Sequence, residues 1–598
     1  MAEKKPAINY TSRDFTTIKS DLVDYARRYY PETFRDFSVN SFGSLMLDTV
    51  SYVGDILSFY LDYQVNETFL STASEYDNIL KISRQLGLKP DLSPASFGVL
   101  TLFVLIPAGT NGAPNYDYAP TLKVGSKFST TDGKLYTLLE DVNFKDIEQN
   151  EIVPGQINNQ TSVPISYIIR ARGQAVSGEL LTRTIEVGAY ERFRKVELPG
   201  TNITEVVSVV DTEGNPYFEV DYLTQNIIYV PIQNTGPDRA TVANILKPLA
   251  VPRRYTVTKE RGSLFLQFGF GTNEDSEEVL DPSKVLVNQH GKKYISDDSF
   301  DPAALVKSDS LGISPSNTTL TIIYRVNTTE NTNTSANSII NVRDSIMSFQ
   351  NELELDITLV QNTKDSLEVI NETAFVGSAP LPSSDELKQR AFGVYSMQNR
   401  IVTQEDLVTA AYNMPRSFGS ISKASAQQDS DSFNQRNINL YVMARGVDGK
   451  LQKANQTIKN NLKSHISRYK MINDSIDILD ANIINLSLFY TIVAYPDVDK
   501  FRAIDTSKRD LSIFFARRRD YEIGESFSIT DIFSVLKNSA LVLDVVEVSV
   551  RTKTGPLYAD TSFIVENNLN SDGRLITCPS DSIFEIKFPN NDIIGTIK

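Results

Sequence analysis

Residues 43–64 read GSLMLDTVSYVGDILSFYLDYQ. At helical period this stretch carries two neighbouring apolar rows and one narrow polar row. The rows are, in order, Met46, Val50, Val53, Leu57, Tyr60 and Gln64; Leu45, Thr49, Tyr52, Ile56, Phe59 and Tyr63; and Asp48, Ser51, Asp55, Ser58 and Asp62. An apolar arc this wide is typical of a helix inside a bundle, which contacts other helices on two or more sides. We therefore expect only the polar row to face solvent.

Two shorter helices are expected on either side of this one in the chain. Residues 11–30 form the first, which ends at Pro31, and its apolar stripe contains Phe15, Ile18, Leu22, Tyr25 and Tyr29. The second begins at a capping box from Thr72 to Glu75 and ends at Gly87. Both are shorter than the roughly 33 Å that residues 43–64 span as a helix.

These three helices allow two interpretations of the wide arc. They can form a closed internal core, or segments of other chains can complete a larger bundle, which is the interpretation we favour. Burying the second row would contribute about 1.5–3 kcal/mol per large side chain before entropy is subtracted. The residues expected to bind partner helices are Leu45, Met46, Val50, Tyr52, Val53, Ile56, Leu57, Phe59, Tyr60 and Tyr63.

The rest of the chain predicts a multidomain α+β fold. Short runs rich in Val, Ile, Tyr and Phe alternate with turn residues from about 95 to 345, and strands then alternate with single helices. We expect an N-terminal helical arm, a β-rich middle and a C-terminal α/β domain. The predicted boundaries are 1–92 for the arm, 93–350 for the β-rich middle, 351–437 for a helical connecting region, 438–555 for an α/β sandwich-like domain, and 556–598 for a tail on that domain.

Composition and charge limit the partners of the 598-residue chain. Its net charge of −15 repels phosphate backbones, so we expect no nucleic acid as a partner. The longest apolar run, residues 99–106, is far short of the ~20 residues that cross a bilayer and indicates a buried strand. A single cysteine, Cys578, excludes an intrachain disulfide. We expect a soluble protein, made and used in a cytoplasm without membrane contact.

Residues with catalytic or metal-binding chemistry form no motif in this sequence. The two histidines, His290 and His465, are too far apart to form a His-rich metal site, and His465 lies on a predicted amphipathic helix as a packed or surface residue. The glycine-rich stretch at 268–278 lacks a phosphate-loop ending and is followed by acidic residues, which favours a β-turn. We expect no enzyme activity, no cofactor and no metal, although sequence spacing does not exclude a pair of carboxylates brought together by the fold.

Four stretches of the sequence resemble the baseplate wedge protein of T-even-type contractile-tailed phages, within the wider group of J-like baseplate proteins. They are INYTSRDFTTIKSDL at 8–22 with the long helix after it, LGISPSNTTLTIIYRVN at 311–327, DELKQRAFGVYSMQNRIVTQEDL with MPRSFGSISKA within 385–424, and the closing CPSDSIFEIKFPNNDIIGTI. The third stretch resembles the broad J-like pattern, and the second and fourth resemble the T-even-type wedge protein. The resemblance extends over nearly the whole chain.

The resemblance implies a structural role in the virion. By this resemblance, two copies would join a larger wedge protein through N-terminal helices in an inter-chain bundle, and C-terminal regions would join neighbouring wedges. Twelve copies would form a ring around the central hub that widens when the contractile tail shortens. Assembly would take place in the host cytoplasm, and the mature location would be the tail baseplate.

Two other functions remain open from sequence. A receptor-binding or fibre protein would explain the long β region, although no internal repeat of fixed period is present. A glycan-degrading tail enzyme would need carboxylates in a cleft lined by aromatic side chains. The chain has no tryptophan but 27 tyrosines, which weakens sugar stacking without excluding it.

Overall fold

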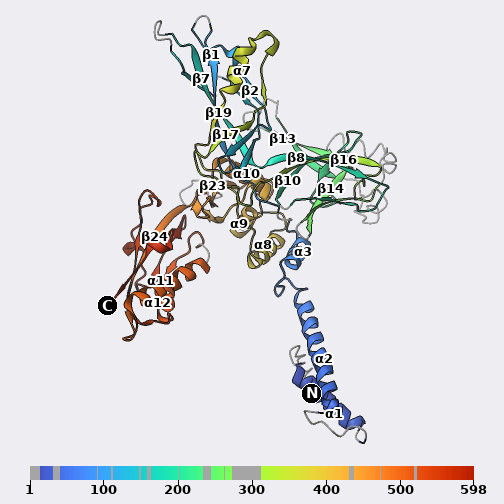
Figure 1. Cartoon of the computed structure of the whole chain (residues 1–598), viewed down its shortest axis with the longest axis vertical. Coiled ribbons are helices and arrows are strands. Elements are labelled where there is room, and N and C mark those ends of the chain that lie inside the picture. The colour runs from blue at the N-terminus through green and yellow to red at the C-terminus, as the bar shows by residue number, and fades with distance from the viewer. Residues whose placement is uncertain are drawn as a thin grey trace. The chain divides into compact units, whose positions relative to one another are not determined.

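The computed structural model describes most of the chain, and helices and strands alternate along it (Figure 1). The described residues are 14–30, 32, 41–89, 92–109, 112–146, 150–157, 163–200, 202–233, 244–260, 263–271, 311–429, 437–471, 473–517 and 521–598. Pro31, His290 and residues 272–278 of the glycine-rich stretch therefore lie outside the described part. The chain divides into two compact units, Met1–Leu88 with Pro382–Tyr395, and Lys89–Leu381 with Ser396–Lys598.

The first unit is helical. Its helices are α1 (Phe15–Tyr29), α2 (Phe42–Asn66), α3 (Tyr76–Gln85) and most of α8 (Ser384–Met397). Asp14 and Ser41 cap the first two helices by accepting hydrogen bonds from the backbone N–H groups of Thr17 and Ser44. A small core joins α3 to α8 and the preceding turn, and it contains Leu70, Ala73, Ile79, Leu88, Leu387, Ala391 and Val394.

Helix α1 lies beside α2 on the polar row, so the expectation that this row faces solvent is wrong (Figure 1). Ser51 is fully buried, and a Cβ atom placed on Gly54 would lie 3.3 Å from Ile18 Cδ1. The Lys19 ammonium pairs with the Asp48 carboxylate at 2.5 Å. The small size of Ser51 and Gly54 lets α1 approach α2 closely, and Lys19 of α1 neutralises the charge of Asp48.

The predicted capping box at Thr72 is also wrong. Helix α3 begins at Tyr76 with Glu75 as its N-cap, and the Glu75 side chain makes no capping hydrogen bond. The Thr72 hydroxyl instead donates to the Asn66 carbonyl at the end of α2, 2.7 Å away. The predicted end of this helix is confirmed, because Gly87 adopts the left-handed conformation with φ of 98°.

The second unit begins with two seven-stranded sheets. The first has the order β17-β3-β4-β7-β1-β19, with β6 paired to β7; its strands are β1 (Phe97–Pro107), β3 (Lys127–Thr130), β4 (Leu135–Leu138), β6 (Glu151–Pro154), β7 (Ser166–Ser177), β17 (Ile339–Asp344) and β19 (Glu368–Ile370). The second has the order β8-β16-β10-β11-β14-β15-β9; its strands are β8 (Glu179–Val187), β9 (Lys195–Leu198), β10 (Ile203–Val210), β11 (Pro216–Glu219), β14 (Arg254–Glu260), β15 (Ser263–Phe268) and β16 (Thr318–Val326).

Each large sheet has its own apolar core. Strands β1 and β7 pair antiparallel along their whole length, and the predicted apolar run at 99–106 lies within β1, where Leu100 and Leu102 are fully buried. Strand β15 alternates half-buried and buried residues, as expected when one face covers a core. Smaller elements are β2 (Thr121–Leu122), β5 (Val142–Asn143), β12 (Ile227–Gln233), β13 (Asn244–Ala250), β18 (Met347–Ser348) and helix α7 (Ile357–Asp365).

Helices and strands alternate in the remainder of the second unit. The elements are α9 (Gln404–Tyr412), β20 (Lys423–Gln428), β21 (Asn437–Arg445), β22 (Leu451–Gln452), α10 (Gln456–Ile466), β23 (Ser475–Asp480), β24 (Asn482–Ala494), α11 (Lys500–Arg517), β25 (Phe527–Ser528), α12 (Ile529–Lys537), β26 (Val542–Thr552), β27 (Leu575–Ile576), β28 (Ser582–Glu585), α13 (Pro589–Asp592) and β29 (Ile593–Ile597). Helix α9 begins at a capping box, in which Thr403 and Asp406 exchange both hydrogen bonds. The predicted multidomain α+β architecture, with N-terminal helices, a β-rich middle and a mixed α/β end, is confirmed.

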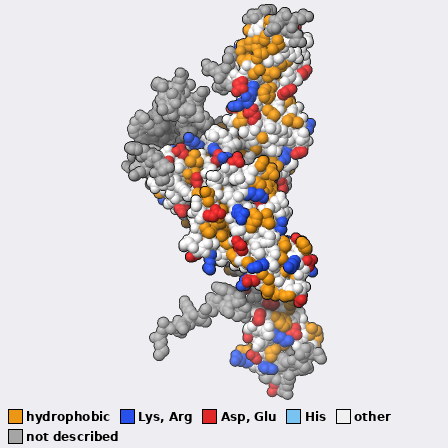
Figure 2. All heavy atoms as spheres, turned by 90° about the vertical axis from the view of Figure 1, so that its left-hand side faces the viewer, with side chains coloured by type: hydrophobic (Ala, Val, Ile, Leu, Met, Phe, Trp, Pro, Cys, Tyr) orange, Lys and Arg blue, Asp and Glu red, His pale blue; other side chains and the backbone are white. Residues whose placement is uncertain are grey.

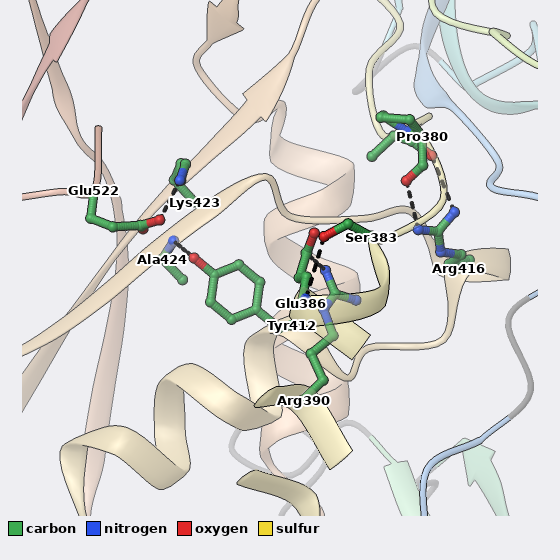
Figure 3. Close-up of polar contacts among 10 residues, drawn as sticks. Pro380, Ser383, Glu386, Arg390, Tyr412, Arg416, Lys423, Ala424 and Glu522 are labelled. Atoms are coloured by element: carbon green, nitrogen blue, oxygen red, sulfur yellow. Dashed lines mark hydrogen bonds and ion pairs between the residues drawn. The ribbon is translucent and has the colours of Figure 1, made fainter. Parts of the chain in front are cut away.

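Hydrogen bonds and ion pairs of charged groups, some of them buried, connect segments in this part of the chain. The Arg416 guanidinium donates to the carbonyls of Ala379 and Pro380, and Lys423 pairs with Glu522 (Figure 3). The Asp592 carboxylate is fully buried and accepts from the Lys553 ammonium at 2.6 Å and the Tyr558 hydroxyl at 2.8 Å. These bonds are structural, because each buried charge has a partner inside the fold.

Candidate assembly interface

The ten apolar residues predicted to bind partner helices form an arc on α2, which we call the apolar arc. Nine of them are exposed, from Tyr63 at 37% to Phe59 at 65%, and Ile56 is half-buried. Large apolar side chains gathered on one helix are unusual on a free surface, and such patches mark sites of association. Hydrophobic atoms are visible on the N-terminal helices at the lower end of Figure 2.

The apolar arc carries no charge. All charged residues of α2 lie on the polar row, at Asp48, Asp55 and Asp62. At 100° per residue the polar row covers about 80° of the helix, centred near Ser51, and the two apolar rows lie roughly 120–140° to either side. Helix α2 therefore has three faces. Helix α1 covers one of them, and the other two remain open within the described residues.

Neither α1 nor α3 covers the apolar arc. Ile18 of α1 lies against Gly54 of α2, and Phe15 and Leu22 are also partly covered, whereas Tyr25 and Tyr29 of the predicted stripe are exposed. Helix α3 packs on α8 instead of lying along α2. The described part of the chain thus does not form the closed internal core that was the alternative interpretation.

Several exposed apolar residues in and next to α2 were not predicted from the sequence. Phe42, Leu61, Val65 and Phe69 each expose more than half of their surface. Phe42, Val65 and Phe69 lie outside the stretch 43–64 whose periodicity was considered, while Leu61 falls between its rows. At the end of α1 the rings of Tyr25 and Tyr29 lie 4.7 Å apart and are exposed, a pairing that helical spacing of four residues makes possible.

The described residues hold no group of three or more His, Cys, Asp or Glu side chains that could bind a metal ion. His465 is buried on α10 against the ring of Tyr469, and burial with the nearby charges of Lys89 and Arg468 lowers its pKa to about 4. Burial raises the pKa of the Cys578 thiol to about 12, so this cysteine is unreactive at neutral pH.

No helix in the described ranges is long and apolar enough for a transmembrane span. On the face that Figure 2 shows, Lys and Arg are interspersed with Asp and Glu.

Comparison with known proteins gives a match for the segment that contains the apolar arc. Residues 14–85, which contain α1, α2 and α3, match the family described as bacteriophage baseplate protein, N-terminal domain. No curated protein sequence matches the chain. The chain also aligns with a chain of the cryo-EM structure of the anti-feeding prophage (AFP) baseplate, 6-fold symmetrised, with 10% identity and a TM-score of 0.27 over 98% of this chain and 94% of that one.

Proposed function

We propose that this chain is a structural, non-enzymatic component of a phage tail baseplate, and that helices of other chains cover the apolar arc of α2. The observation that carries the proposal is an uncharged apolar helix surface, open on two faces, inside the segment that matches baseplate N-terminal domains. Burying that surface against partner helices would contribute about 1.5–3 kcal/mol per large side chain, as an upper bound.

The partners we propose are a second copy of this chain and another baseplate wedge protein. One face of α2 is taken by its own α1, so two faces remain for two further helices. The sequence resemblance implies a bundle of two copies of this chain with one larger wedge protein. In such a bundle, each α2 would contact two helices from other chains, one for each open face. The ten residues of the apolar arc are the proposed contacts.

Each part of the chain has a different mechanical role in the proposed assembly. The helical arm is the fixed joint, because a large apolar contact is costly to open. The β-rich middle is a spacer, and the C-terminal α/β region contacts the next wedge to form a ring around the hub. When the tail contracts and the ring widens, the C-terminal contacts pivot while the helical joint stays closed, since packed interfaces switch between discrete arrangements.

Co-expression with the proteins encoded beside this chain tests the proposal. Native mass measurement should show a complex with two copies of this chain and one copy of a larger partner. A chain that stays monomeric in every combination would contradict the proposal. A trimer of this chain alone would indicate a fibre protein instead, and release of sugars from cell-wall material by the purified chain would indicate an enzyme.

A further inference from the structure

In the turn between α2 and α3, residues 66–75, one side chain caps the end of α2 and another caps the start of α3. At the end of α2, the Asn66 carbonyl accepts from the Thr72 hydroxyl at 2.7 Å. At the start of α3, the Glu67 carboxylate takes the position that a local capping side chain would normally occupy, because Glu75 makes no such bond itself. Each helix end is therefore capped by a residue from the other end of the turn.

The Glu67 carboxylate makes an unusually complete set of bonds for a residue at a helix end. Oε1 accepts from the Ser74 backbone N–H at 2.8 Å and the Ser74 hydroxyl at 2.6 Å, and Oε2 accepts from the Asn78 amide at 2.9 Å. The Glu75 N–H approaches both oxygens at 3.3 Å. Glu67 is only 6% exposed, and its negative charge lies at the positive end of the α3 dipole.

Further contacts hold the turn from both sides. The Tyr63 hydroxyl of α2 donates to the Glu75 carboxylate at 3.1 Å, and Leu70 and Ala73 are buried in the core that joins α3 to α8. The hydrogen bonds that the Glu67 carboxylate accepts lower its pKa to about 2, chiefly through the Ser74 hydroxyl and the Asn78 amide. The carboxylate is thus ionised at every pH at which the protein would work.

We propose that Glu67 is a positioning residue that fixes the direction of α2 relative to α3, together with the Thr72 hydroxyl. Charge-assisted hydrogen bonds to a buried carboxylate are strong and directional, so a turn held by Glu67 has one geometry, whereas a turn without it would allow many. The long helix then leaves the α3–α8 core at a set angle. This inference concerns the free chain and does not depend on the partners proposed for the apolar arc.

Distance measurement between two spin labels tests the inference. The labels are placed at Leu61→Cys on α2 and Lys81→Cys on α3, both exposed positions, in a full chain that carries Cys578→Ser and is diluted with unlabelled chain. The parent should give one narrow distance distribution. Glu67→Gln, which keeps the size of the side chain but loses the charge and one acceptor oxygen, should broaden the distribution at least about twofold without loss of helix content.

A matched control separates the turn from general charge effects. Asp77→Asn removes one negative charge from the exposed first turn of α3 and should leave the distribution narrow. Thr72→Val removes only the hydroxyl at the other end of the turn and should also broaden it, which keeps the test valid if Glu67→Gln fails to fold. Distributions as narrow as the parent in the folded Glu67 and Thr72 variants would overturn the inference, as would equal broadening in the Asp77 control.

Discussion

The Lys19 ammonium lies 2.5 Å from the Asp48 carboxylate and joins α1 to the polar row of α2. This pair, with the close approach of Ile18 to Gly54, places α1 on one side of the long helix and leaves the apolar arc uncovered on the other. The position of α1 therefore decides which faces of α2 remain available to other chains.

Substitution of Val53 and Leu57 by Asp should abolish assembly with baseplate partners. Both side chains are about half exposed in the free chain, so the stability of the chain should change by less than about 0.5 kcal/mol. In a partner interface, however, two carboxylates would be buried without counter-charges, which costs several kcal/mol. Native mass measurement after co-expression gives the readout. The control Val402→Asp, at an exposed position of the second unit, should still assemble, and normal complex formation by the double variant would refute the role of the apolar arc.

Reversing the charge of Lys19 should loosen α1. Lys19→Glu places a carboxylate against Asp48, and since both groups are about one-third exposed the pair is worth roughly 0.2–1 kcal/mol. Amide hydrogen exchange within α1 should therefore accelerate by up to about fivefold. The double variant Lys19→Glu with Asp48→Lys should restore the slower rates. Equal rates in the single and double variants would show that the ion pair does not hold α1 in place.

The α2–α3 turn should lose stability only in strong acid. Hydrogen bonding lowers the pKa of Glu67 from 4.5 to about 2 in the folded protein. The unfolded chain binds the proton first, so the contribution of Glu67 is complete above about pH 4.5 and is lost as the pH falls toward 2. Local exchange of the first α3 amides, followed across this range, should show that loss in the parent and not in Glu67→Gln. The same pH dependence in both would assign it to another carboxylate.

A second pH dependence should come from His465 at higher pH. Its folded pKa of about 4 lies below the ordinary value of 6.5, so the unfolded chain gains the proton first as the pH falls. Stability should therefore decrease below about pH 6.5, by roughly 2 kcal/mol between pH 7.5 and pH 5. His465→Phe preserves a ring against Tyr469 and cannot titrate, so its unfolding free energy should vary less over this range. An unchanged pH profile in that variant would show that His465 is not the group responsible.

Periodicity in the sequence predicts the helices and the fold class because these features depend on local patterns. The heptad rows identify α2, and Gly87 indicates the end of α3. The predicted domain boundaries stay a prediction. Strand pairing could not be predicted, since partners such as Ile203 and Val326 lie far apart in the chain.

At the candidate site, too, local features could be predicted from the sequence and contacts between distant segments could not. The residues of the apolar arc follow from helical spacing, but the helix that would cover each face does not. A row of Ser and Asp suggested contact with water because only polarity was considered, whereas the small side chain of Ser51 and the nearby Gly54 let α1 approach. The Thr72 motif was misread because Glu67, which precedes it, caps α3 in its place.

The absence of charge from the apolar arc has a thermodynamic consequence. A joint formed through this surface would have almost no Coulombic component, so concentrated salt would not dissociate it. Its strength would instead follow the hydration of apolar groups, with a negative heat capacity of association and weaker binding on cooling. Disassembly of such a joint would be favoured by cold or by detergent, and not by ionic strength.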